Sequence, residues 1–293
     1  MRKLIVLVAL IVGTFVTSAL PAGAVTGDYQ KDFEHPFVGL VRFYDEDGQY
    51  MWRCSGSLLT PTVFLTAGHC SVGADSARVY FQQSVAANYD PQSGIDPVTG
   101  YPKDCGPGTL GVSCATSDEI YDYDFAPAWR DFPNTRDVGL VILDQPVSMP
   151  EYGKLAASGT LDRLATKRGL QETTFTHSGY GLSLVNPVHE VSLLERLMAE
   201  SKLTNLTSAL TDGYNLQVNF NGTGYGGACY GDSGGPVFYG KYPSNTIVAI
   251  TGWNRNGNCA GVGYFYRTDR HEVIDWILQT VPQDQVDNIK FAG

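Results

Sequence analysis

The feature that most constrains the fold is a succession of short apolar runs, each rich in Val, Ile, Leu, Phe or Tyr and bounded by Gly, Pro, Asn or Asp. Runs of this length with frequent turn residues between them are typical of antiparallel β-strands. Long amphipathic helices do not alternate with the runs, which argues against a parallel α/β sheet. The sequence therefore predicts an all-β chain with strands near 37–43, 55–59, 63–66, 77–81, 138–143, 173–176, 216–220, 236–239 and 247–252.

Three segments depart from this pattern. Residues 271–280 carry apolar side chains at helical spacing behind Asp269, a candidate N-cap, and predict a C-terminal helix. Residues 193–198 fit a short helix or a strand equally well. Residues 82–131 are irregular and rich in Pro, Gly, Asp and Tyr, so we interpret them as a long surface insertion.

The N-terminus has the three-part layout of a secretory signal peptide. Arg2 and Lys3 precede an uncharged run at 4–20, and Ala22-Gly23-Ala24 follows as a small-residue cleavage site. A membrane anchor is the alternative, but the run is near the lower length limit for spanning a bilayer. We expect residues 1–24 to be removed and the mature chain to be secreted to the extracellular space without a membrane attachment.

Charge and cysteine content narrow the classes of partner. Lys and Arg number 20 against 30 Asp and Glu, and the formal net charge of −10 argues against a nucleic-acid partner or an anionic membrane surface. The 6 cysteines of an exported chain are expected to form disulfides rather than to bind a metal. Six cysteines allow fifteen pairings, and spacing does not choose among them. No metal or organic cofactor is predicted.

The segment Cys229-Tyr-Gly-Asp-Ser-Gly-Gly-Pro236 gathers glycines and a proline around one serine. A serine hydroxyl is a poor nucleophile unless a base takes its proton, and the transition state needs amide donors aimed at the developing oxyanion. Glycines permit the turn that would aim the amides of Gly231 and Ser233 at one point. A plain glycine-rich turn does not explain Asp232 beside Ser233. We interpret Ser233 as a candidate nucleophile and the two amides as a candidate oxyanion hole.

A general base must come from one of five histidines, and His69 is the one that ends an apolar run, at 63–70. A structural histidine after a strand is the plain alternative. A catalytic imidazole needs a buried carboxylate to fix its tautomer. Asp137 leads into the apolar run 138–143, where an unpaired carboxylate would be costly. The three residues together favour His69 as the base and Asp137 as the group that orients it.

The segments Thr66-Ala-Gly-His69-Cys70, Asp137-Val-Gly-Leu140 and Gly231-Asp-Ser233-Gly-Gly-Pro236 resemble, in this chain order, the three signatures of the trypsin/chymotrypsin serine proteases. The resemblance covers nearly the whole mature chain. It implies two six-stranded antiparallel β-barrels packed together with a C-terminal helix, at 25–160 (insertion included) and 161–293. It also implies hydrolysis of peptide bonds in protein or peptide substrates through an acyl-enzyme, without a cofactor, and we expect a monomer.

Two other classes of protein are alternatives to a serine protease. The pattern Gly-x-Ser-x-Gly also occurs in α/β-hydrolases such as esterases and lipases, in which the catalytic acid and the histidine follow the serine. In this chain His271 is the one histidine that follows Ser233. A protease-fold binding module without activity is the second alternative. Such proteins usually lack one of the three catalytic residues, and His69, Asp137 and Ser233 are all present.

The resemblance assigns roles to further residues. Val25 resembles the family's buried mature N-terminus, whose free amine pairs with the acid beside the nucleophile, here Asp232. Removal of the signal peptide after Ala24 would then itself expose the activating amine. The plain alternative is that Val25 only begins a disordered lead-in. The pairs Cys54–Cys70 and Cys229–Cys259 match family disulfides, which leaves Cys105 and Cys114 for each other, a pair without family support.

The expected specificity pocket follows from the same resemblance. Gly227 stands at the position that forms the base of the pocket, where an Asp would select Arg or Lys, and Ala228 follows it. We therefore expect no preference for basic side chains, and an apolar or aromatic residue instead. The strand that pairs with substrate is expected at Thr251, Gly252 and Trp253, although Trp253 fits a core position equally well. Arg267, if it lay near the pocket, would instead favour acidic side chains.

Overall fold

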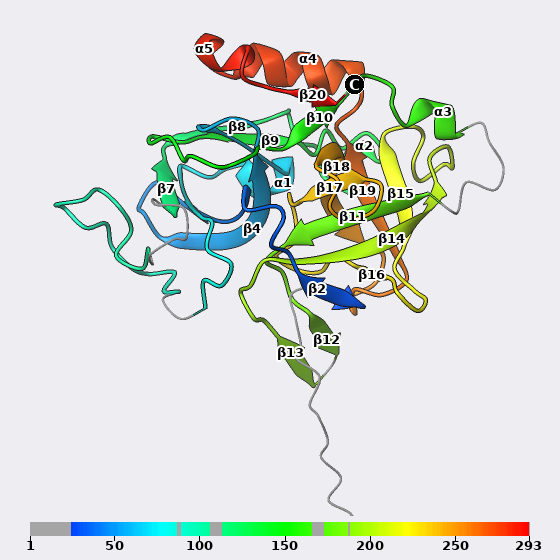
Figure 1. Ribbon diagram of the computed structural model, residues 1–293, viewed down its shortest axis with the longest axis horizontal. Coiled ribbons are helices and arrows are strands. Elements are labelled where there is room, and N and C mark those ends of the chain that lie inside the picture. The colour runs from blue at the N-terminus through cyan, green and yellow to red at the C-terminus, as the bar shows by residue number, and fades with distance from the viewer. Residues whose placement is uncertain (1–24, 87–88, 106–112, 166–172, 187, 293) are drawn as a thin grey trace, which may run out of the picture.

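The computed structural model describes residues 25–86, 89–105, 113–165, 173–186 and 188–292. The predicted signal peptide lies outside the described residues. Figure 1 shows two β-structures side by side, with helices α4 and α5 along one edge of the molecule and the hairpin of β12 and β13 projecting from the opposite edge. Strands dominate both halves, so the predicted all-β class is confirmed. Within the described part of the chain, no helix is long and apolar enough to cross a membrane.

The first β-structure is a seven-stranded antiparallel sheet in the order β7-β6-β3-β4-β5-β9-β8. Only Asp118 separates the two edge strands in the sequence, so these edges meet and the sheet is a nearly closed barrel. The predicted barrel had six strands; the seventh arises because the chain breaks at Asp118. The strands are β3 (Val38–Tyr44), β4 (Tyr50–Leu58), β5 (Val63–Thr66), β6 (Ser76–Tyr80), β7 (Cys114–Ser117), β8 (Glu119–Asp122) and β9 (Gly139–Ile142).

The second β-structure contains a closed ring of six strands in the order β17-β11-β14-β15-β19-β18, because β17 also pairs with β18. This ring is the predicted six-stranded barrel. The ambiguous segment 193–198 leads into β14 and is not helical. The strands are β11 (Thr174–Gly179), β14 (Leu197–Asn205), β15 (Asn215–Asn219), β17 (Pro236–Tyr239), β18 (Thr246–Asn254) and β19 (Val262–Arg267).

Short strands from both ends of the chain add to the second barrel. Near the N-terminus, β1 (Thr26–Gly27) pairs with β16 (Gly226–Gly227), and β2 (Tyr29–Lys31) pairs with β14. The strand β10 (Lys154–Ala156) pairs in parallel with β18 and with the C-terminal strand β20 (Phe291–Ala292). A separate hairpin consists of β12 (Leu184–Asn186) and β13 (His189–Val191). The N-terminal strands β1 and β2 therefore pair with the second half of the chain although they precede the first barrel in sequence, and a division near residue 160 stays a prediction.

The predicted C-terminal helix is α4 (His271–Thr280), and its buried Val273 and Ile277 belong to the same apolar cluster as β3, β4 and β5. This cluster also contains residues of β17, β18 and β19, so the helix packs on a core to which both barrels contribute. The expected cap at Asp269 is wrong. The N-cap is Arg270, without a side-chain cap, because the Asp269 carboxylate accepts hydrogen bonds from Arg267 and from the amide of Leu161.

The segment 82–131 is less irregular than its composition suggests, because β7, β8 and the short helix α2 (Ala128–Asp131) fall within it. Its first half is tied to the barrel by Arg42, which is fully buried on β3 and pairs with Asp104 at 2.9 Å. The hydroxyl of Tyr80 also donates to Asp104 at 2.8 Å. The remaining helices are single turns, α1 (Gly68–Ser71), α3 (Asp162–Ala165) and α5 (Gln283–Val286).

Candidate active site

His69 lies on α1, the single helical turn that follows β5. Strand β5 pairs with β9 so that Thr66 is opposite Gly139, and this register brings His69 next to Asp137, which precedes β9. The backbone amide of His69 donates to Asp137 Oδ1 at 2.8 Å, and Nδ1 lies 2.9 Å from Oδ2. Because a carboxylate only accepts hydrogen bonds, Nδ1 carries the proton. The neutral ring then has its lone pair on Nε2.

The environment of His69 favours its protonated form. Asp137 is 5% exposed, whereas the His69 side chain is 31% exposed. Burial of the ring, the largest influence, lowers the pKa of His69, but the charge of Asp137 and the hydrogen bond to it outweigh this effect. The pKa of His69 is therefore raised above its usual value. An imidazole with a raised pKa is a stronger base toward a hydroxyl proton.

Ser233 lies in a tight loop between β16 and β17. Gly231 and Gly234 adopt φ values of +95° and +79°, a region that disfavours residues with a Cβ. Gly234 also packs closely on the corner between β5 and α1, where a Cβ would come within 2.2 Å of Thr66 Oγ1. The amide of Ser55 donates to the carbonyl of Ser233 at 2.8 Å. These contacts hold the serine loop of the second barrel against the histidine turn of the first.

His69 and Ser233 line one cavity of about 370 Å³ between the barrels. The described hydrogen bonds of the His69 ring are made with Asp137. None of the described hydrogen bonds joins the ring to Ser233 Oγ. Such bonds are often long in ligand-free enzymes and tighten with substrate. The cavity is also lined by Cys229, Tyr230, Thr251, Gly252, Trp253, Asn254, Arg255, Asn256 and Gly257.

Two backbone amides around Ser233 have no hydrogen-bond acceptor among the described residues. The amides of Asp232, Gly234 and Gly235 donate to carbonyls of Cys229, Thr251 and Asp232. Within the described part of the chain, no backbone hydrogen bond uses the amides of Gly231 or Ser233. The Gly231 carbonyl is fixed by the hydroxyl of Ser55 at 2.8 Å. Two amides on either side of Asp232 that have no acceptor among the described residues can donate to an oxygen of a ligand.

Asp232 points away from the cavity into the second barrel. It is 2% exposed, and it accepts hydrogen bonds at 2.8 Å from the amides of Gly181 and Cys229. Burial raises the pKa of Asp232 to about 7, against the opposing effect of these amides. No salt bridge to Asp232 forms among the described residues. Val25 is buried against Leu197 and Ala199, and the adjacent β1 pairs with Gly226–Gly227.

The residues expected to form the specificity pocket divide into two groups. Thr251, Gly252 and Trp253 line the cavity, whereas Gly227 and Ala228 are not among its lining residues. Trp253 stacks on Tyr264 with ring centroids 4.3 Å apart. Sequence reasoning missed Tyr230 and Asn254, which directly flank predicted site residues. Proximity in sequence was the one available signal for them.

Arg267 lies elsewhere in the second barrel. It is buried and pairs with Asp269 at 2.8 Å and with Asp162 at 2.7 Å. Its charge is therefore neutralised by two carboxylates that the sequence analysis did not connect with it. Arg267 is not among the residues that line the cavity, whose described lining includes a different arginine, Arg255.

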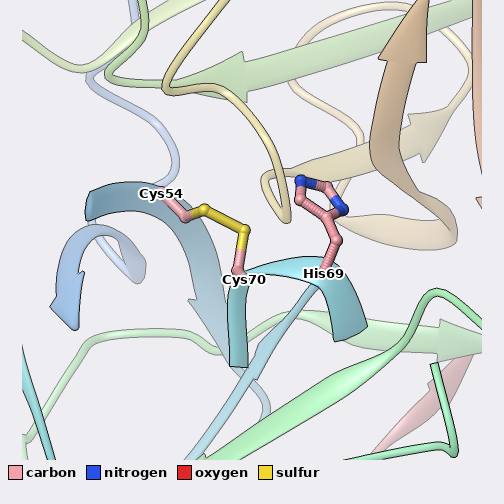
Figure 2. A group of neighbouring side chains, drawn as sticks. All are labelled: Cys54, His69 and Cys70. Atoms are coloured by element: carbon pink, nitrogen blue, oxygen red, sulfur yellow. A yellow bond between two sulfur atoms is a disulfide. The ribbon is translucent and has the colours of Figure 1, made fainter. Parts of the chain in front are cut away.

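Three disulfides are present, Cys54–Cys70, Cys105–Cys114 and Cys229–Cys259. The first joins β4 to the histidine turn, and Figure 2 shows it beside the imidazole of His69. Sulfur and ring nitrogen atoms of these three residues lie within 4.8 Å of one another. Both sulfurs are bonded to each other, so this group offers no thiolate to a metal. The third disulfide ties the serine loop to the segment after β18.

Comparisons with known proteins identify the family and the fold of the chain. The protein family described as Trypsin matches residues 24–277. Serine protease 7 of Drosophila melanogaster is 27% identical over 264 residues, 85% of this chain and 62% of that protein. Brachyurin of Leptuca pugilator is 26% identical over 78% of this chain and 87% of its own length. The chain thus spans less than two thirds of the first of these relatives.

Solved structures show the same fold at lower sequence identity. A structure titled HL collagenase aligns with a TM-score of 0.56 and 17% identity, covering 87% of this chain and 96% of that one. A structure titled GrC aligns with a TM-score of 0.58 over 84% of this chain and 94% of its own. The two barrels, the chain order of the signature segments and the family match over 24–277 lead to one conclusion: this chain belongs to the trypsin family of serine proteases.

Proposed function

We propose that the chain is a secreted serine endopeptidase in which Ser233 is the nucleophile, His69 the general base and Asp137 the group that orients His69. One observation carries the proposal. Asp137 is bound by both the backbone amide and Nδ1 of His69, and the same imidazole shares a cavity with Ser233. This arrangement fixes the tautomer that can accept a proton at Nε2.

The proposed reaction has two halves. Ser233 Oγ attacks the peptide carbonyl carbon while its proton passes to His69 Nε2, and the amides of Gly231 and Ser233 stabilise the oxyanion. The C–N bond then breaks, and His69 returns the proton to the leaving amine. In the second half, water attacks the acyl-enzyme with His69 again as base, which releases the acid and free Ser233. No step needs a metal or an organic cofactor.

The proposed activation uses the buried acid beside the nucleophile. A charged Asp232 without a cationic partner is costly in this environment. A free amine created by cleavage before Val25 would supply that partner, since Val25 is already buried beside the strand pair that precedes Ala228. The chain would then become active on removal of its leader. N-terminal sequencing of the active protein tests this step; full activity with a start well beyond Val25 would exclude it.

The wider proposals depend on the family. Substrates are proteins or peptides, and the primary preference is not for Arg or Lys, because Gly227 offers no charge at the expected base of the pocket. The mature chain is proposed to be a secreted monomer with barrels at 25–160 and 161–293.

Cleavage of an unfolded protein tests the proposed activity. The processed chain should digest a reduced, unfolded protein substrate, and Ser233→Ala should lower kcat by about 10⁴-fold to 10⁶-fold while the variant keeps its fold. Hydrolysis of simple esters alone does not discriminate, because esterases and proteases share the acyl-enzyme step. Failure of the folded, processed chain to cut the substrate would favour an inactive binding module.

A further inference from the structure

One side of the cavity that contains Ser233 is formed by the side chain of Asn254. Asn254, the last residue of β18, extends its side chain toward the serine loop, where Nδ2 donates to the carbonyl of Ala228 at 2.6 Å. Its Oδ1 lies on the other wall, 3.1 Å from the point where a Cβ on Gly263 would stand. The carboxamide therefore extends from β18, opposite Gly263 of β19, to the loop that carries Ala228. It connects the end of β18 to Ala228, which the sequence predicted as a pocket residue.

The ring of Phe220 lies against both Gly227 and Gly263. A Cβ on Gly227 would come within 2.0 Å of Phe220 Cδ1, and a Cβ on Gly263 within 2.3 Å of its Cζ. The aromatic ring therefore occupies the region into which side chains at 227 and 263 would project. Phe220 is 4% exposed and packs near His177 and Phe265 in the core of the second barrel. A ring fixed in such a core does not move aside at low cost.

The cavity of about 370 Å³ that contains Ser233 is bounded on this side by Cys229 and Asn254. It is lined by Cys229, Tyr230 and residues 251–257, while Gly227, Ala228 and Gly263 are absent from its described lining. The Oδ1 of Asn254 is buried without a hydrogen-bond partner among the described residues. A buried polar atom without a partner is unfavourable for stability. Hydrogen bonding alone therefore does not explain why the Asn254 side chain takes this position.

From this geometry we infer that Asn254 and Phe220 restrict the residue on the acyl side of the scissile bond to small side chains, such as Gly, Ala and Ser. The inference rests on the proposed endopeptidase function and names its substrate class. It departs from the sequence-based expectation of an apolar or aromatic residue, which rested on the absence of a charged side chain at Gly227. Asn254 is a specificity-determining residue in this account, and Phe220 closes the base.

A matched series of peptide substrates that differ only at this residue tests the inference. For the processed chain, kcat/KM for Ala should exceed that for Leu and Phe by about tenfold or more, in keeping with what small pockets discriminate. Asn254→Gly should raise the Leu/Ala ratio of kcat/KM by about tenfold. Phe should stay a poor substrate for this variant, because Phe220 still closes the base.

Asn258→Gly is the matched control, because it makes the same exchange at an exposed position of the same loop that does not line the cavity. It should leave the Leu/Ala ratio unchanged. If Asn254→Gly does not fold, Asn254→Ser, which shortens the side chain, provides the same comparison. A wild-type preference for Leu or Phe over Ala, or an unchanged ratio in a folded Asn254 variant, would overturn the inference. Absence of any Ser233-dependent cleavage would instead contradict the proposed function.

Discussion

Asp137 holds His69 at two points, through the backbone amide at 2.8 Å and through Nδ1 at 2.9 Å. The carboxylate thereby fixes both the position of the α1 turn and the tautomer of the ring. Asp137 itself is nearly inaccessible, whereas the imidazole reaches the cavity that contains Ser233. A base with a fixed tautomer at the edge of a cavity is the arrangement that activation of a serine hydroxyl requires.

The first prediction concerns Asp137→Asn. The amide can present an NH₂ group to Nδ1, which favours the wrong tautomer, so kcat should fall about 10⁴-fold while the fold is kept. Steady-state cleavage and circular dichroism measure the two effects. Asp47→Asn, at an exposed position, is the matched control and should retain wild-type kcat. A folded Asp137→Asn variant with nearly normal kcat would show that Asp137 does not orient the base.

The second prediction concerns the pH dependence of acylation. Asp137 raises the pKa of His69 above its usual value despite the opposing effect of burial. The base must be neutral to accept the serine proton, so kcat/KM should rise with pH on a limb centred above the ordinary histidine pKa of about 6.5. A pH profile of kcat/KM for the wild-type chain measures this limb. A limb centred clearly below that value would contradict the described His69–Asp137 pair.

The third prediction concerns Asp232 before processing. Its pKa is raised to about 7 by burial, whereas the unfolded chain loses that proton near the ordinary value. Between these values the folded state binds more protons, so stability falls as pH rises from about 4 to 7, by up to roughly 1 kcal/mol per pH unit. Denaturant unfolding of a chain extended before Val25 should show this loss, and Asp232→Asn should reduce it.

The matching experiment uses the chain that begins at Val25. If its amine pairs with Asp232, the folded carboxylate is stabilised and this pH-dependent loss should disappear. The same slope in the extended and the processed chain would mean that the amine does not reach Asp232.

The fourth prediction concerns His177, a buried histidine of β11 outside the candidate site. Burial lowers its pKa to about 3, and its Nε2 contacts the hydroxyl of Ser201. The unfolded chain takes up a proton near pH 6.5, so the stability contributed by the neutral ring is lost as pH falls from there toward 3. Equilibrium unfolding of His177→Gln at pH 7 and pH 4 should show a smaller loss on acidification than the wild type. Equal losses would contradict a neutral, buried His177.

Much of the fold was accessible from the sequence because local patterns determine it. The run 63–66 is strand β5, and the helix predicted at 271–280 is α4, since strand alternation and helical spacing are local signals. The cap at Asp269 was not predictable in this way. Its carboxylate is committed to Arg267 and to the amide of Leu161, which is distant in sequence.

The candidate site likewise has parts that the sequence predicts and parts that depend on contacts between residues distant in the sequence. His69, Asp137 and Ser233 stand in motifs that chemistry alone makes suggestive, and the three disulfides pair as the family resemblance and the remaining two cysteines implied. The contact of the Phe220 ring with Gly227 and Gly263 was not predictable. Phe220 follows β15 and reaches Gly227 and Gly263 only through the closure of the second barrel, and nothing near Phe220 in the sequence indicates that contact.

Labelling with an organophosphonate that reacts with activated serines tests the central claim most directly. In the folded, processed chain, mass spectrometry of a digest should find the adduct on Ser233, and His69→Ala should slow its formation by several orders of magnitude. Ser233→Ala should form no adduct at that peptide. A folded, processed wild-type chain that leaves Ser233 unlabelled, or labels it equally fast without His69, would contradict the account.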